Sequence, residues 1–335
     1  ALMETLADYG VGSYFGLNTL TTGIYKAWLV NGDRWAAAQL ASVLLVAVML
    51  LMLMERRAQA RLRFAPGKGG GAATGRHRLR GIAQLFAQLA CLLPLLLGFV
   101  IPLLVLLRLV VDEARFGEIG LPWARFGQWS VVSLGLAAAG AALTVGLALL
   151  LSALRRLRPR AWLPRAVAQL AGLGYAVPGA VIAIGLLLPL AWLQPWLPSL
   201  VPLVTGSVAG LLWAYAVRFS GVALQSVEAG YARIAPSLDE SAQLLGQRGP
   251  GLWWRVHRPL LTRSALAAAL LVFVDIMKEL PATLVLRPFD SDTLAVVAYQ
   301  LARDERLAEA ALPAIAIVLV GLLPVGLLWR AMKLR

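Results

Sequence analysis

Long apolar runs are the feature that most constrains how this chain folds. Residues 35–54 carry no charged side chain over about the 20 residues that a helix needs to cross a bilayer. Comparable runs follow at residues 85–107, 130–154, 166–193, 202–217, 265–286 and 307–329. Composition agrees, since 60% of the 335 residues are hydrophobic and only 14% are charged, which is unusual for a soluble protein. We predict an all-α polytopic membrane protein with seven membrane-spanning segments.

The net charge of +14 lies mainly in the connections between these runs. Residues 55–80 hold eight Lys or Arg against one acid, and residues 155–165 hold five Arg and no acid. Residues 108–129 balance three Arg with three acids. The distribution follows the positive-inside rule, so it predicts an outer start, a cytoplasmic C-terminus and a lipid rather than a nucleic-acid partner. We interpret residues 55–80, which are rich in Gly, as a flexible cytoplasmic linker.

The residue pattern does not indicate a metal site, a disulfide or a catalytic site. The one cysteine, Cys91, lies within an apolar run, and His77 and His257 have no ligand spacing around them. No paired acids or activated nucleophile line up near a membrane boundary. We therefore predict no metal site and no catalytic residue.

A polar stretch at residues 236–260 interrupts the apolar pattern. Ser237 and Glu240 have the spacing of a helix capping box, and Gly246 stands where a left-handed C-terminal cap is needed. One apolar stripe lies between them: Leu238, Ala242 and Leu245. Because so short a helix is marginal alone, it either folds back on its own domain or docks on another protein.

The same stretch resembles a known motif, the EAA loop of ABC importer permeases. That pattern is Glu-Ala-Ala, three residues, Gly, nine residues, Ile, any residue, Leu-Pro. Its counterpart here is Glu240-Ser241-Ala242, Gly246 and Val256-His257-Arg258-Pro259 at the same spacing. The departures are Ser241, Val256 and Arg258.

In that family the loop is a coupling helix that fits a groove on a separate cytoplasmic ATPase. The resemblance implies a type I ABC importer transmembrane domain, a six-helix unit with this cytoplasmic helix. It assigns ATPase coupling to Ser237, Glu240, Ala242, Gly246 and Pro259. The implied partners are two ATPase subunits, which would use ATP and magnesium, while this chain would bind no cofactor and would not be an enzyme.

Further segments are similar to ferric-iron ABC permeases. They are Lys278-Glu279-Leu280-Pro281-Ala282-Thr283-Leu284, Arg287-Pro288-Phe289, Asp292-Thr293-Leu294, residues 175–179 with the span after them, and residues 303–313. This similarity implies a permease of the bacterial inner membrane that receives Fe³⁺ from a periplasmic binding protein. The outer acids Asp290, Asp292, Asp304 and Glu305 are then either docking residues or a solvated rim. Thiamine, polyamine, sulfate and phosphonate permeases share the coupling loop and remain alternatives.

An internal repeat divides the chain. Met3, Leu6, Thr19, Leu20 and Tyr25 match Met277, Leu280, Thr293, Leu294 and Tyr299 at one constant offset, and a long apolar run follows both copies. We predict that residues 1–54 are the tail and last helix of a first permease copy and that residues 81–335 are a complete second copy. The chain would then be the C-terminal part of a fused two-copy permease, unable to transport alone.

Charged residues inside one predicted span suggest a polar path. Asp275, Lys278 and Glu279 precede Pro281, and burying such charges in lipid costs at least ~2.5–3.5 kcal/mol each. Either Asp275 and Lys278 form an internal ion pair or the group lines a translocation path, which is our prediction for Asp275, Lys278, Glu279 and Pro281. A predicted helix break at residues 174–179 adds Tyr175 and Pro178. A secondary transporter with Asp275 and Glu279 as ion sites is the alternative from another class.

Overall fold

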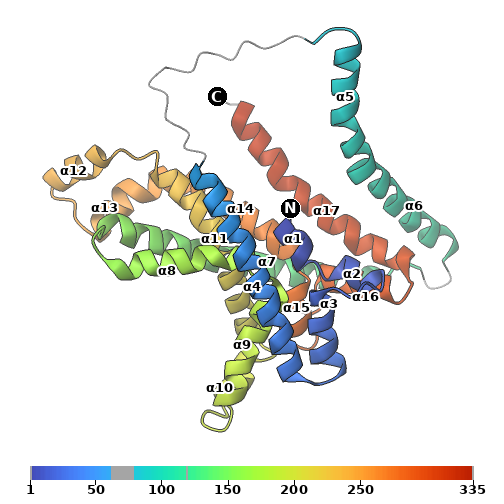
Figure 1. The fold of residues 1–335 in the computed structure, drawn as a ribbon. Coiled ribbons are helices and arrows are strands. Elements are labelled where there is room, and N and C mark those ends of the chain that lie inside the picture. Colours follow the sequence, from blue (N-terminus) through green and yellow to red (C-terminus); the bar gives the residue numbers. More distant parts are fainter. Residues whose placement is uncertain (1, 62–78, 118–119, 334–335) are drawn as a thin grey trace.

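The computed structural model describes residues 2–61, 79–117 and 120–333, which form helices and loops without a β-strand. By length and composition, six helices in these ranges are able to cross a membrane. They are Arg34–Glu55, Ile82–Phe116, Trp123–Leu157, Val208–Tyr231, Pro250–Met277 and Leu307–Pro324. The predicted all-α polytopic membrane fold is confirmed (Figure 1).

The long helices correspond to six of the seven predicted runs. They are α4 (Arg34–Arg61), α5 (Ile82–Leu95), α6 (Ile101–Phe116), α7 (Trp123–Leu157), α11 (Val208–Tyr231), α14 (Arg258–Met277) and α17 (Leu307–Lys333). The shorter helices are α1 (Leu2–Ala7), α2 (Gly10–Tyr14), α3 (Leu20–Tyr25), α8 (Trp162–Leu173), α9 (Gly179–Leu193), α10 (Leu200–Val204), α12 (Pro236–Leu244), α13 (Pro250–Leu252), α15 (Pro281–Leu286) and α16 (Leu294–Arg303). A π-helical turn, Leu96–Val100, joins α5 to α6 between the two prolines of that span, because proline removes a backbone donor from the helical ladder.

The linker prediction needs a correction at its start. Helix α4 continues through residues 55–61, because Glu, Arg, Ala and Gln are good helix formers and no Gly or Pro interrupts them. Residues 62–78, which contain the Gly-rich centre, lie outside the described residues.

Helices α7, α11 and α14 pack together and form the main core. Small residues on α7 allow close contact: a Cβ at Gly140 would lie 2.6 Å from Ile276 Cδ1 and 3.2 Å from Tyr215 Cδ2. Tyr215, Leu211 and Val272 are among the fully buried side chains there. Close packing of this kind replaces the hydrophobic driving force that is missing between helices in lipid.

A second core joins the N-terminal helices to the middle of the chain. Ile24, Tyr25 and Leu44 from α3 and α4 are buried with Ala180 and Ile184 of α9. Figure 1 shows these blue N-terminal helices beside α9 and α15. The first predicted copy is therefore built into the second rather than tethered to it.

Two of the predicted spans are interrupted helices. The run 166–193 is divided into α8, a 3-10 turn at Gly174–Ala176, and α9, as predicted. The run 265–286 is divided where α14 ends at Met277 and α15 begins at Pro281. We call these the first and the second helix break.

The run 202–217 has different bounds from those predicted. Helix α11 begins at Val208 and continues to Tyr231, so Arg218 lies inside the helix instead of at its cytoplasmic end. The sequence after Arg218 stays largely apolar, which allows the helix to continue through the core.

The repeated segments have matching backbone features. Thr19 caps α3 and Thr293 caps α16, and each side chain accepts a backbone N–H from the first turn. A positive φ angle also recurs at the same offset, at Gly16 and Asp290. Left-handed backbone is unusual for a non-glycine residue such as Asp290, so its presence at both positions is a specific likeness between the two segments.

Candidate translocation site and coupling loop

The two helix breaks contact each other. The chain leaves the first break at Pro178 and Gly179, and a Cβ at Gly179 would lie 2.5 Å from Glu279 Oε1 and 2.6 Å from Arg218 Nη1. Glu279 belongs to the second break. Glycine thus allows the backbone of one break to lie directly against charged groups at the other.

Glu279 is only 4% exposed and has two partners. Its Oε2 lies 3.1 Å from Arg218 Nε, and its Oε1 accepts the backbone N–H of Ala282 at 2.9 Å. The second contact satisfies a donor in the first turn of α15, where helix dipoles favour negative charge. Arg218 Nε is within ion-pair distance but completes no hydrogen bond with a described residue, so the attraction is mainly between the charges.

A cavity of about 680 Å³ opens beside this ion pair. Its polar lining is Glu55, Tyr175, Arg218, Gln225, Asp275, Lys278 and Glu279. Three carboxylates against two cations make the lining more favourable to a cation than to an anion. Leu51 and Met52 of α4 also line it, so both predicted copies border the cavity.

The internal ion pair and the polar lining, which were alternatives from the sequence, occur together. Lys278 Nζ lies 3.1 Å from Asp275 Oδ1, and both side chains line the cavity with Tyr175 and Glu279. Pro178 and Pro281 do not line it; they stand at the starts of α9 and α15. The structure therefore brings four of the predicted path residues together and gives the two prolines a positional role.

Arg218 is a cavity residue that sequence reasoning missed. The predicted span 202–217 ends directly before it, which places it outside the membrane-spanning segment. The available signal was the apolar sequence on its C-terminal side, which indicates a charge inside a helix rather than at its end.

A cluster of tyrosines abuts the second break. The Tyr25 hydroxyl donates to the carbonyl of Pro281. Tyr299 donates to Tyr9 at 3.0 Å, and the hydroxyls of Tyr299 and Ser13 lie 2.8 Å apart. These contacts cross between the N-terminal helices and the second copy, so they fix the break against the N-terminal core.

A short helix, α12, forms within the predicted coupling loop, but its predicted N-terminal cap is wrong. Helix α12 begins at Pro236 with Ala235 as its N-cap residue, and no side chain caps it. Proline is pre-organised for the first helical position, so the helix starts earlier than predicted. Ser237 is then inside the first turn and cannot form the capping box with Glu240.

The C-terminal cap of α12 has the predicted geometry. Gly246 has a φ of +81°, and the N–H of Gln247 donates to the carbonyl of Ala242 at 2.9 Å. The left-handed residue ends the helix and satisfies its last carbonyls.

The apolar stripe of α12 is mostly uncovered. Ala242 is buried, but Leu238, Leu244 and Leu245 are 47%, 90% and 82% exposed. Glu240 is also exposed. The described part of its own domain thus leaves these leucines uncovered, and they are free to contact another molecule.

Asp239 holds the first turn of α12 in place through contacts that no spacing in the sequence predicts. Its carboxylate lies 2.7 Å from Arg156 Nε and 2.9 Å from His257 Nε2. Arg156 also donates to the carbonyl of Ile234 at 3.1 Å. Burial alone would raise the pKa of Asp239, but the hydrogen bonds from Arg156 and His257 outweigh it and hold the pKa below its ordinary value.

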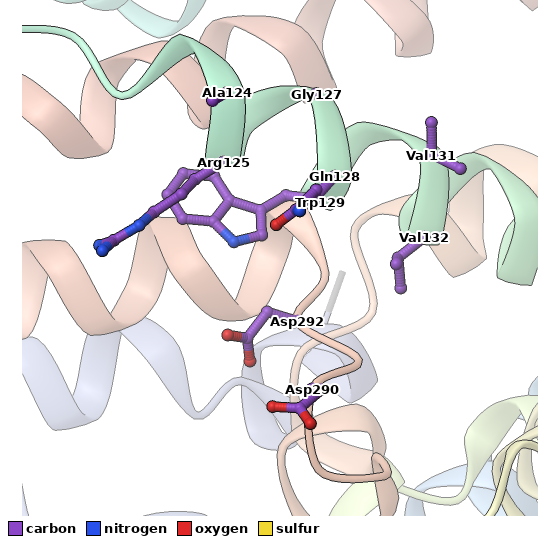
Figure 2. Close-up of a pocket in the computed structure, with 9 residues that line it drawn as sticks. All are labelled: Ala124, Arg125, Gly127, Gln128, Trp129, Val131, Val132, Asp290 and Asp292. Atoms are coloured by element: carbon purple, nitrogen blue, oxygen red, sulfur yellow. The ribbon is translucent and has the colours of Figure 1, made fainter.

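The outer acids divide between two places. Asp290 and Asp292 line a cavity of about 930 Å³ with Arg125 and Trp129, and Figure 2 shows these two acids on a loop facing the first turns of α7. Asp292 is paired with Arg287, so it is not simply a solvated rim charge. Asp304 and Glu305 lie instead in the turn between α16 and α17.

This architecture defines a class: an all-α polytopic membrane protein with two interrupted helices around a charged interior cavity, an arrangement typical of transporters. No protein-family model matches the chain. Over 118 residues it is 29% identical to the Fe(3+)-transport system permease protein FbpB 2 of Haemophilus influenzae. The match covers 35% of this chain and 23% of that protein, so the chain spans less than a quarter of the relative's length.

Proposed function

We propose that the chain is a permease subunit of an ATP-driven ABC importer and that α12 is its coupling helix. The observation that carries the proposal is the exposed leucine surface of α12, whose base is held by Asp239 and whose end is set by Gly246. A groove on a separate ATPase is the partner that such a surface fits. Glu240 and Pro259 belong to the same proposed coupling loop.

Motion of α12 has a direct route to the cavity. Asp239 contacts His257, which is followed directly by α14. Helix α14 ends at Met277, next to Lys278 and Glu279 at the second break. A displacement of the coupling helix would therefore move the charged end of α14, and the flexible backbone of the break would absorb the change.

We propose ferric iron as the substrate. The match to a ferric-iron permease supports it, and the cavity lining, in which three carboxylates outnumber two cations, is compatible with the passage of a cation. A periplasmic binding protein would deliver the ion near Asp290, Asp292, Asp304 and Glu305. Thiamine, polyamine, sulfate and phosphonate are the competing substrates.

The matching caps and the left-handed backbone at Gly16 and Asp290 support a two-copy permease, and we propose that it lies in the bacterial inner membrane. Residues 1–54 would belong to the first copy and residues 81–335 to the second. Two ATPase subunits would bind from the cytoplasm, and they would use ATP and magnesium.

Uptake into proteoliposomes tests the proposal. The complete permease is reconstituted with its ATPase and binding protein, and radioactive ferric iron or thiamine is supplied from the outer side. The expected result is iron uptake that requires ATP hydrolysis and survives an ionophore. Uptake without the ATPase that the ionophore abolishes would contradict the proposal and favour a secondary transporter.

A further inference from the structure

A groove runs between α7 and α14 beside the coupling loop. One cavity of about 710 Å³ lies between the C-terminal end of α7 and the turn from α12 to α13. A second cavity of about 390 Å³ lies between α7 and α14. Both are lined by Gly146, Leu149 and Trp253, so they adjoin each other, and we call them together the α7–α14 groove.

One end of the α7–α14 groove is basic. Arg158 and Arg248 line the larger cavity and Arg258 lines the smaller one, while no acidic residue lines either among the described residues. The guanidinium of Arg258 lies 4.7 Å from the centre of the Trp254 ring, and Trp254 is 56% exposed. Arginine with exposed tryptophan is typical of the headgroup level of a membrane, so this end is complementary to an anion there.

The other end of the groove is apolar and follows two candidate membrane spans. Val145, Leu149, Leu261 and Leu266 line it along α7 and α14. The α7 lining runs from Ala142 to Arg158, about 24 Å of helix. That length covers the roughly 15 Å hydrocarbon depth of one leaflet and the headgroup layer next to it.

We propose that the α7–α14 groove binds one anionic phospholipid on the side of the membrane that carries the coupling loop. Its phosphate lies between Arg158 and Arg248, and an acyl chain lies against Leu149 and Leu266. A soluble anion would leave the apolar part empty, and a zwitterionic lipid would leave the arginines without net charge compensation. The headgroup would join the end of α7 to the turn after α12, so the bound lipid would position the coupling loop.

Lipid binding to the complete chain in detergent tests the headgroup contact. Native mass spectrometry compares phosphatidylglycerol with phosphatidylcholine of the same acyl chains. Phosphatidylglycerol should bind more tightly, and Arg158→Gln with Arg248→Gln should weaken it by about 30-fold, since each basic residue near an anionic headgroup contributes about 5-fold. Arg160→Gln with Arg233→Gln removes the same charge from exposed positions outside the groove and should leave binding unchanged.

A second variant tests the acyl-chain contact. A Cβ at Gly146 meets no atom within 4 Å, so Gly146→Leu places its side chain in the shared part of the groove and should weaken both lipids. Gly135→Leu, on the same helix and equally open, is the control.

Equal affinity for the two lipids, or unchanged lipid binding in the Arg158→Gln/Arg248→Gln variant, overturns the proposal. So does competition by soluble glycerol phosphate at the same concentration, which indicates a simple anion site. If the Arg158→Gln/Arg248→Gln variant keeps its lipid binding but loses a protein that co-purifies with the wild type, the groove binds a protein partner instead.

Discussion

Arg218 Nε lies 3.1 Å from Glu279 Oε2 in the interior of the helix bundle. This ion pair joins the middle of α11 to the second helix break, and Gly179 of α9 packs against both side chains. Three segments from different parts of the chain thus meet at one pair of charges. Because the pair also lines the cavity, it is both a structural contact and the strongest candidate for a gate.

Breaking this pair should be costly. Arg218→Met or Glu279→Gln alone leaves the remaining partner without its counter-ion, a change of about 3–5 kcal/mol for buried pairs. Thermal unfolding of the chain in detergent should show a lower melting temperature for each single variant. The double variant should recover part of the loss, because the opposing charge has gone too; purely additive losses would mean that the two residues are not coupled.

Transport separates a path role for Glu279 from a structural one. In the assembled importer, Glu279→Gln should lower iron uptake at matched membrane levels, because the cavity loses a carboxylate. Wild-type uptake by this variant would remove Glu279 from the proposed path and leave the ion pair with a structural role.

Gly179→Ala should disturb the same contact from the opposite side. The added methyl group would lie 2.5 Å from Glu279 Oε1 and 3.1 Å from Ala282 N, and overpacking of this kind costs about 1–3 kcal/mol. Gly185→Ala on the same helix meets open space and should leave stability unchanged or slightly higher. Equal melting temperatures for the two variants would show that the charges move aside without cost.

Gly246→Val should uncouple the importer. A β-branched residue at a φ of +81° costs about 1–2 kcal/mol or more, which should disorder the turn after α12. We expect normal membrane insertion with loss of uptake and of ATPase co-purification. Asparagine tolerates left-handed backbone, so Gly246→Asn should retain much of the activity. Full uptake by Gly246→Val would contradict the coupling role.

The Asp275–Lys278 pair gives a further test of the cavity. Lys278→Met alone should lower uptake and stability, because it removes the cation 3.1 Å from a largely buried carboxylate. If the pair only neutralises itself, adding Asp275→Asn should restore both properties. We expect stability to return but uptake to stay low, since a carboxylate of the cavity is lost; full recovery of uptake would exclude Asp275 from the path.

Asp239 should make the coupling loop sensitive to acid. Its folded-state pKa is lowered, so the stabilisation is present above the ordinary Asp pKa of about 3.9 and is lost as the pH falls through the lower folded value. Asp239→Asn should therefore melt at a lower temperature than the wild type at pH 7, and the difference should shrink as the pH approaches the folded value. Glu240→Gln, an exposed change on the same helix, is the control. A difference that persists unchanged in acid would assign the effect to packing instead of charge.

Local sequence determined the helices, the two breaks and the end of α12. These features depend on the composition of each segment and on its backbone freedom. Uncharged runs form long helices, and Gly and Pro interrupt them. Position 246 has a left-handed backbone, which glycine adopts without steric cost. The incorrect capping-box prediction has a local cause as well, because α12 already begins at Pro236 and Ser237 therefore lies inside its first turn.

Tertiary structure alone decided which charges meet. The apolar sequence after Arg218 indicates only that it lies inside a helix, and no spacing rule connects it to Glu279 or connects Arg156 to Asp239. A charge inside the bundle is tolerated only where the fold supplies an opposite charge, and that partner comes from a distant segment. The chain sequence specified where charges occur, but only the packing of α7, α11 and α14 determined their partners, since Coulomb attraction depends on separation in space.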